Sequence, residues 1–276
     1  MRIGLDIAQQ RMKWDELVER VRFADEGGFD GVWGFDHLQP MYGSGPGECF
    51  EGMTTLAALS GLTSRVRLGL LVTGVTYRHP SVLAAQALTI DHASHGRLEL
   101  SLGAAWFEPE HRALGIDFPP TGERIDMLDE ALTIARGLLT EDDFGFDGAH
   151  WQIDGASMRP RPVQQPHPPI WIGASGEQRM LPLVAKHADA WHSFGDPRTL
   201  ARKSRLLDQH AEAAGRDPDA ILRAASLDLS QPWDDVRRTA DALRDHGFGY
   251  LVCGWPSEGR DRLDEFVDQI LPELAA

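Results

Sequence analysis

Val66 to Glu110 reads VRLGLLVTGVTYRHPSVLAAQALTIDHASHGRLELSLGAAWFEPE, and this stretch decides the fold. Its apolar runs predict strands at Val66–Thr73 and Arg97–Leu102, with a helix at Ser81–Ala93 between them. Each strand runs out into a loop that is rich in Gly, Thr and Trp and carries little charge. Ligands of parallel α/β proteins bind at the carboxyl ends of the strands. The two loops therefore predict a pocket for a flat, largely apolar ligand.

The same alternation of strand and helix continues toward both ends of the chain. The other expected strands are Ile3–Ile7, Gly31–Phe35, Ile170–Ile172, Ala190–Ser193, Ile221–Leu229 and Tyr250–Trp255. The other expected helices are Trp14–Glu26, Thr54–Leu62, Glu123–Leu139, Gln178–His187, Thr199–Ala214, Trp233–Asp245 and Arg262–Leu274. Eight strand–helix units predict an α/β fold, a (β/α)8 TIM barrel that forms one domain over residues 1–276.

Two other features of the chain bear on this fold. A doubly wound open sheet is the alternative, but the first strand ends in Asp6-Ile7-Ala8-Gln9-Gln10 and lacks the glycine fingerprint of that fold. The segment Glu141–Pro169 is irregular and rich in Gly, Asp and Pro. It predicts an insertion on the barrel rim, between the fourth helix and the fifth strand, that carries a short hairpin.

The amino-acid composition limits the kinds of partner that the protein can bind. The net charge of −15 argues against a nucleic-acid or acidic-membrane surface, and no apolar run approaches the length of a membrane helix. The first residues form an expected strand without a signal-peptide layout, and Cys49 and Cys253 match no metal or redox spacing. We therefore expect a cytoplasmic protein with a small-molecule partner.

The fourth strand carries a carboxylate at an inward position. Leu98, Leu100 and Leu102 share one face, which is expected to lie against the helices. Glu99 would then point into the barrel, where a charge needs a partner such as Arg67 or Arg2. A structural ion pair is the favoured interpretation, and a catalytic Glu99 is the alternative.

The second strand ends in an acid–histidine pair, Asp36-His37. A histidine at the carboxyl end of a barrel strand is well placed for proton transfer. Neighbouring residues face opposite ways on a strand, so both side chains reach one pocket only if the chain turns there. His37 as a satisfied surface histidine and Asp36 as a loop-capping side chain are the alternatives.

Two further loops contain small residues that let a backbone approach a ligand. Gly173-Ala174-Ser175-Gly176 precedes an expected helix, whose start would supply N–H donors to a phosphate; it is also an ordinary strand-to-helix turn. Gly103-Ala104-Ala105 leaves room for a ring system, with Trp106 either as its wall or as a rim packing residue. Neither loop alone decides the function.

The sequence contains no motif that indicates a metal site or a triad hydrolase. His92 and His95 lie three residues apart, but no HExxH motif or cysteine pair accompanies them. The chain also has no G-x-S-x-G elbow, so a triad hydrolase is not expected. We therefore expect no metal site.

Three patterns together resemble one known family. They are H-P-x-x-x-A at His79, S-x-G-R before the fourth strand and G-x-x-W-x-x-x-E at Gly103, followed by GERIDMLDEAL. These patterns resemble the luciferase-like monooxygenase superfamily, and the whole resembles its branch of oxidoreductases that depend on the deazaflavin coenzyme F420. The resemblance runs from Met1 to about Phe194 and more loosely to the end.

The resemblance implies a TIM barrel with the cofactor at the carboxyl-end mouth. It implies His37 and Asp36 as the catalytic pair near the reacting ring, and a non-proline cis peptide within Leu70–Thr73. The cofactor-binding residues that it implies are Thr73, Gly103, Ala104, Trp106, Gly173, Ala174, Ser175 and Gly176. Trp106 and His192 would line the substrate side, and a homodimer is expected.

The resemblance also marks the alternatives. Some F420-dependent dehydrogenases carry a glutamate where this chain has Trp106, and the phosphate-binding lysines of sugar-phosphate dehydrogenases have no clear counterparts. We therefore expect an F420-dependent oxidoreductase that acts on a small organic molecule other than a sugar phosphate. An FMN-dependent monooxygenase is the main alternative. A non-catalytic flavin-binding barrel and a flavin-free lyase or isomerase are the others.

Overall fold

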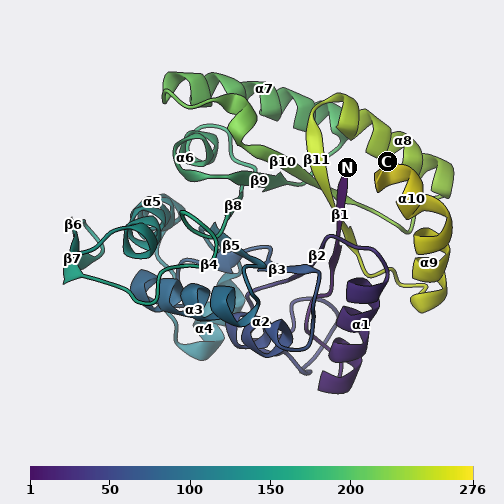
Figure 1. Ribbon diagram of the computed structural model, residues 1–276, viewed down its shortest axis with the longest axis horizontal. Helices are drawn as coiled ribbons and strands as arrows, with labels where there is room; N and C mark the ends of the chain where they lie inside the picture. The colour runs from purple at the N-terminus through teal and green to yellow at the C-terminus, as the bar shows by residue number, and fades with distance from the viewer. Residues whose placement is uncertain (276) are drawn as a thin grey trace.

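Parallel strands close into a barrel with helices on its outside (Figure 1). The computed structural model describes residues 1–275. The barrel strands, in chain order, are β1 (Arg2–Asp6), β2 (Gly31–Gly34), β3 (Arg67–Leu70) with β4 (Thr73–Gly74), β5 (Leu98–Gly103), β8 (Ile170–Gly173), β9 (Ala190–Ser193), β10 (Leu222–Leu227) and β11 (Phe248–Gly254). Pairing of β1 with β11 and of β3 with β5 closes the ring, which confirms the expected TIM barrel.

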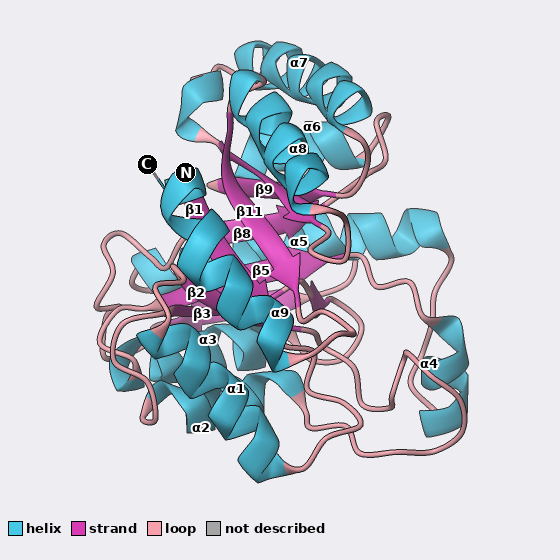
Figure 2. Ribbon diagram, turned by 90° about the vertical axis from the view of Figure 1, so that its right-hand side faces the viewer, coloured by secondary structure: helices cyan, strands magenta, loops and turns pink. Residues whose placement is uncertain are grey.

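Helices lie around the outside of this ring, as the cyan helices around the magenta strands in Figure 2 show. They are α1 (Trp14–Glu26), α2 (Gly52–Ser60), α3 (Pro80–Ala93), α4 (Glu108–Leu114), α5 (Thr121–Thr140), α6 (Met180–His187), α7 (Pro197–Ala213), α8 (Trp233–Asp245), α9 (Arg260–Glu265) and α10 (Leu271–Ala275). A 3-10 turn, η1 (Pro218–Ala220), precedes β10, and a π-helical turn, η2 (Phe266–Ile270), joins α9 to α10. The short helix α4, on the loop-rich side of Figure 2, was not expected from the sequence.

Helix starts near the barrel mouth are set by caps, and they fall slightly before the expected positions. Helix α3 begins at Pro80 because proline suits the first helical turn and the His79 side chain accepts the Ser81 N–H. Helix α7 follows the same rule, with Asp196 capping a start at Pro197. The apolar period of the sequence placed these two starts one and two residues too late, because the caps and the first-turn prolines are not part of that period.

The third strand is broken, which differs from the continuous strand expected over Val66–Thr73. Its two parts, β3 and β4, are separated at a cis peptide bond between Leu71 and Val72. A non-proline cis bond within Leu70–Thr73 is what the resemblance implied. The break places Val72 at the barrel mouth, half-exposed.

An aromatic plug fills the middle of the barrel. Trp33 and Trp171 pack with ring centroids 4.5 Å apart, and Trp33 Nε1 donates to the Tyr250 hydroxyl at 3.1 Å. Gly4 faces this plug, since a Cβ there would lie 2.5 Å from Trp33 Nε1 and 2.6 Å from Tyr250 Oη. Residues that alternate with Gly4 along β1 therefore also point inward. The plug separates the amino-end floor of the barrel from its carboxyl-end mouth.

Glu99 lies at the floor, on the amino-end side of the plug. Its carboxylate accepts hydrogen bonds from Arg67 Nε and, at 2.6 Å, from Trp171 Nε1. This arrangement confirms that Glu99 points inward and that Arg67 is its partner. Burial raises the pKa of Glu99 although Arg67 and Trp171 oppose the shift. Because the amino-end face of a TIM barrel serves stability, the ion pair is structural.

The irregular segment between α5 and β8 forms the expected hairpin. Strands β6 (Phe144–Asp147) and β7 (Gln152–Ala156) pair antiparallel, at the left edge of Figure 1. The turn between them is held by Glu130 of α5, which accepts three backbone N–H groups at 2.7–3.2 Å. Trp151 in this turn lies beside His79, with ring centroids 6.2 Å apart. The hairpin tip thus reaches the rim at the start of α3.

Candidate active site at the barrel mouth

His37 follows β2 at the barrel mouth, in an aromatic setting. Its ring centroid lies 5.0 Å from that of Phe35, 6.2 Å from Trp106 and 5.7 Å from Phe107. The residue is 7% exposed. Its Nδ1 contacts Glu110 Oε2 at 3.0 Å, and its Nε2 has no hydrogen-bond partner among residues 1–275. The free nitrogen is therefore the one that can act on a ligand.

Glu110 is the centre of a buried hydrogen-bond network that the sequence did not predict. Besides His37, the Glu110 carboxylate accepts the backbone N–H groups of Leu38 and Gln39 at 2.6 Å each, and the Tyr77 hydroxyl. Burial raises the pKa of Glu110, but the hydrogen bonds outweigh it and lower the pKa to about 2. A carboxylate can only accept, so it requires a proton on His37 Nδ1 and makes Nε2 of the neutral ring the basic atom.

Helix α4 brings Glu110 to this position. The ring of His111, the next residue, is held at both nitrogens: Nδ1 lies 2.9 Å from the Phe107 carbonyl and Nε2 lies 2.6 Å from Thr76 Oγ1. The carbonyl accepts from Nδ1–H, so Nε2 accepts from the threonine hydroxyl. Tyr77 stacks on the same ring at 4.7 Å. These contacts fasten α4 to the loop after β4.

Asp36 is buried beside His37 but contacts a different set of residues. Arg78 Nη1 and Nη2 donate to its two carboxylate oxygens at 2.6 and 2.9 Å, and the Gly74 N–H donates at 2.9 Å. Arg78 also donates to Glu51 at 2.6 Å. Both oxygens of Asp36 are thus engaged within the protein. The surroundings of the mouth carry more charge than expected, because Asp36, Arg78 and Glu110 are buried beneath the loops.

Two predicted glycines flank Val72 at the mouth. A Cβ on Gly103 would collide with Val72 Cγ2, and one on Gly173 would lie 2.8 Å from Val72 Cγ1. Real Cβ atoms do not approach so closely, so both positions require glycine while Val72 lies between them. The half-exposed valine and its glycine neighbours form a smooth apolar surface, which suits one face of a flat ring.

The other residues predicted around the ring differ in their access to the mouth. Trp106 is 65% exposed, whereas Thr73 is 1% exposed and its N–H lies 3.4 Å from Ser101 Oγ. Ala104 is half-buried, and its carbonyl accepts from Arg124 at 2.9 Å. A contact of Thr73 with a cofactor stays a prediction, but its side chain lies beneath the surface.

The predicted phosphate turn is partly available. The Ala174 N–H donates to the His192 carbonyl at 3.0 Å and so belongs to the barrel. The N–H groups of Ser175 and Gly176 have no acceptor in the described chain, and both residues are exposed. Arg179, beside the turn, pairs with Asp126 on α5. Only two of the three predicted N–H donors are therefore free for a phosphate.

His192 faces the inside of the mouth from β9. It is 2% exposed, and its Nε2 lies 3.1 Å from Ser226 Oγ on β10. Burial lowers the pKa of His192 to about 4, so the ring is neutral at pH 7. Its predicted contact with a substrate stays a prediction.

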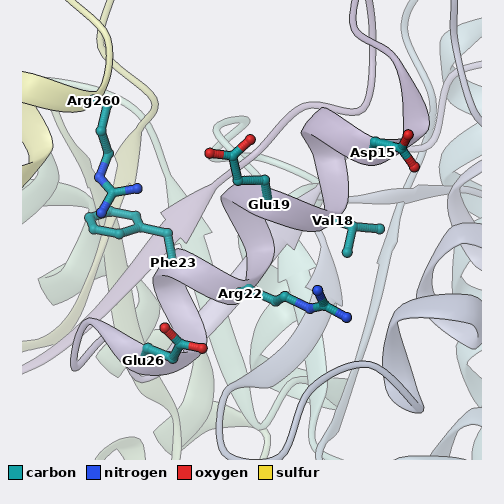
Figure 3. A pocket seen from close by; sticks show the side chains of 7 residues that line it. All are labelled: Asp15, Val18, Glu19, Arg22, Phe23, Glu26 and Arg260. Carbon is teal, nitrogen blue, oxygen red and sulfur yellow. The ribbon is translucent and has the colours of Figure 1, made fainter.

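A surface hollow elsewhere does not match this chemistry. It has a volume of about 460 Å³ and lies on the outer face of α1, where Phe23 packs under Arg260 (Figure 3). Its lining residues belong to α1 and, through Arg260, to α9, and none of them is a residue of the barrel strands. Among the described residues no helix is long and apolar enough to cross a bilayer, and no cluster of three or more His, Cys, Asp or Glu side chains fits a metal ion.

The comparisons with known proteins agree with this geometry. The family model described as luciferase-like monooxygenase matches residues 1–247. The chain belongs to the luciferase-like monooxygenase family. An uncharacterized family relative from Mycobacterium tuberculosis is 31% identical over 80% of this chain and 75% of its own length.

Relatives with described activities divide between two cofactors. The F420-dependent hydroxymycolic acid dehydrogenase of M. tuberculosis is 30% identical over 88% of this chain and 66% of its own. The oxygenase component of the flavin-dependent trigonelline monooxygenase of Acinetobacter baylyi is 31% identical over 81% and 66%. A solved F420-dependent secondary alcohol dehydrogenase superposes with a TM-score of 0.85 at 17% identity, covering 98% of both chains, which supports the fold alone. This luciferase-like protein is therefore an α/β-barrel member of an oxidoreductase family.

Proposed function

We propose that this luciferase-like protein is an F420-dependent oxidoreductase that transfers a hydride between the deazaflavin coenzyme and a small organic substrate. The observation that carries the proposal is the free Nε2 of His37, held by Glu110 at the mouth of the barrel. Coupled hydride and proton transfer requires a fixed base beside an apolar surface on which the cofactor ring can lie. Val72, Gly103 and Gly173 form that surface here, which we call the platform. The F420-dependent relative supports the choice of coenzyme, and so does the Asp36-His37 pair that the resemblance to the F420-dependent branch implies.

The residues at the mouth fit a deazaflavin. Val72, with Gly103 and Gly173 on its two sides, offers an apolar face to the ring. The free N–H groups of Ser175 and Gly176 are suitable donors to a phosphate. The coenzyme, when bound, would supply a hydride donor or acceptor at its C5 carbon.

The protein's own residues bind and release the proton that accompanies the hydride. Nε2 of His37 takes a proton from a substrate hydroxyl, or returns it in the reverse direction. Glu110 keeps the other proton on Nδ1 and stabilises the imidazolium that forms, because its low pKa keeps it ionised at neutral pH. Asp36 acts as a positioning residue: by binding Arg78 and the Gly74 N–H, it holds the loop that carries Tyr77. Trp106 stands edge-on to the imidazole, with ring centroids 6.2 Å apart.

An FMN-dependent monooxygenase is the second candidate. The flavin-dependent relative supports this candidate, because it is 31% identical to this chain and the F420-dependent dehydrogenase is 30% identical. The two cofactors share a tricyclic ring and a phosphate, so the platform and the phosphate turn suit both. A homodimer, a cytoplasmic location and a small-molecule substrate stay predictions.

Cofactor titration tests the proposal. Cofactor-free protein is titrated with F420 and, separately, with FMN, and binding is followed by cofactor fluorescence. We expect saturable F420 binding and weaker FMN binding. Tight FMN binding without F420 binding would overturn the proposal in favour of the monooxygenase, and binding of neither would favour a flavin-free barrel. His37→Ala is expected to bind the cofactor but to lose hydride transfer.

A further inference from the structure

Asp6 ends β1 and points into the barrel mouth. Arg2 and Gly4 precede it at two-residue intervals and face inward: Arg2 lies over the Tyr250 ring at 5.4 Å, and a Cβ on Gly4 would strike Trp33 and Tyr250. Because side chains alternate along a strand, Asp6 is the next inward residue, on the mouth side of the aromatic plug. The mechanism proposed above does not use it.

The Asp6 carboxylate lacks a compensating partner. Its Oδ1 is buried and has no hydrogen-bond partner in the described chain, and no ion pair involves it there. Burial raises the pKa of Asp6 to about 7. Gly254, its register partner on β11, is exposed and would have open space around a Cβ. The carboxylate therefore borders space that is open to a ligand, and a buried charge without a partner is costly to the fold.

Basic groups near the mouth are already engaged. Arg78 is bound by Asp36 and Glu51, and Arg124 donates to the carbonyls of Ala104 and Pro119. His192, which also points inward, is neutral at pH 7 and contacts Ser226. None of these groups is available to neutralise Asp6.

Exposed aromatic side chains follow three of the barrel strands on the same face. Tyr42, Trp106 and Phe194 come after β2, β5 and β9 and are 62%, 65% and 67% exposed. Burial and, to a lesser extent, the charge of the Asp6 carboxylate raise the pKa of Tyr42. Aromatic faces attract organic cations, and a water-shielded carboxylate strengthens that attraction.

We propose that Asp6 binds the cationic group of an organic substrate, a protonated or quaternary amine, at the mouth of this barrel. The cation supplies the partner that Asp6 lacks, and the exposed aromatic residues contact its carbon substituents. The net charge of −15 steers cations toward the site. The inference rests on the proposed function only in naming the ligand a substrate.

A charged ligand and its uncharged isostere test the inference. Choline and 3,3-dimethylbutan-1-ol have the same shape and differ in the charge of one atom. Affinities are measured by ligand-observed saturation-transfer NMR on wild-type protein, on Asp6→Asn and on Asp15→Asn, a control with the same change of net charge on the exposed face of α1. We expect wild type and Asp15→Asn to bind choline about tenfold more tightly than the isostere. Asp6→Asn should bind the two equally.

Two outcomes of the choline experiment would contradict the inference. Equal affinities in the wild type would show that the mouth does not select a cation, and a preference that survives in Asp6→Asn would place the cation elsewhere. F420 and FMN titrations on the same variants separate the two proposals. Failure of the wild type to bind F420 would overturn the proposed function and leave the choline result standing. Loss of cofactor binding in Asp6→Asn would assign Asp6 to the cofactor instead.

Discussion

Nδ1 of His37 and Oε2 of Glu110 lie 3.0 Å apart although 73 residues separate them in the chain. His37 follows the barrel strand β2, and Glu110 lies in the short helix α4 after β5. Their contact fixes which nitrogen of the imidazole carries the proton. The contact between His37 and Glu110 therefore leads directly to a testable prediction.

Glu110→Gln is expected to lower the rate of hydride transfer by about 10²–10⁴-fold, because the amide neither fixes the tautomer nor stabilises the imidazolium. Pre-steady-state kinetics with the bound cofactor measures the rate. Nitrogen-15 NMR of labelled histidine provides a second readout, in which the Nδ1–H tautomer of His37 should be lost. Glu108→Gln, on the exposed face of the same helix, should change neither; an unchanged tautomer in Glu110→Gln would contradict the assignment.

Gly103→Ala is expected to weaken cofactor binding by about tenfold, or 1.4 kcal/mol, because the new methyl group pushes Val72 out of the platform. The double variant with Val72→Ala should recover most of the affinity, since the smaller side chain leaves room for the methyl group. Fluorescence titration measures both. Gly61→Ala, which has open space around its Cβ, is the control. If the double variant binds no better than Gly103→Ala, the platform is not the cause.

Arg78→Met is expected to destabilise the protein by about 3 kcal/mol, because it leaves the buried Asp36 carboxylate without its charged partner. Urea denaturation at pH 7 measures the free energy of unfolding. Arg112→Met removes an exposed ion pair with Glu108 and should cost less than about 0.5 kcal/mol. Similar losses in the two variants would mean that the Asp36 pair contributes no more than a surface ion pair.

Asp6→Asn is expected to stabilise the protein in a pH-dependent way. The folded-state pKa of about 7 exceeds the unfolded value of 3.8, so the contribution of Asp6 to stability is fully present below pH 3.8 and is lost as pH rises to about 7. The advantage of the variant should therefore grow from near zero at pH 4 to about 4 kcal/mol at pH 8. Urea denaturation across this range checks it. If the difference in free energy of unfolding between Asp6→Asn and the wild type does not change with pH, the pKa of Asp6 is not raised by folding.

The barrel was predictable because periodicity is a local signal. Alternation in β5 placed Glu99 inside, and the strand-end rule placed His37 and Gly173 at the mouth; the structure agrees with each of these positions. Apolar pattern also located the strands before and after the irregular segment. Cap residues and the break at Leu71 shifted element ends, because propensity does not report a turn fixed by tertiary contacts.

The partners inside the site were not predictable in the same way. Glu110 ends the G-x-x-W-x-x-x-E pattern, four residues after Trp106, and that spacing of one helical turn was the signal available for it. Its contacts come from Leu38 and Tyr77, on two other loops, and no periodicity relates loops to one another. Arg78 was overlooked for the same reason. Its bond to Asp36 depends on how the loop after β4 folds back over the end of β2.

The Glu110 carboxylate binds the imidazole with one oxygen and the Leu38 and Gln39 N–H groups, where the loop over the mouth begins, with the other. One side chain thus holds both the first residues of this loop and the base, His37. A displacement of the loop large enough to release those N–H groups also removes the restraint on His37. The position of this loop and the alignment of the base are consequently coupled through a single carboxylate.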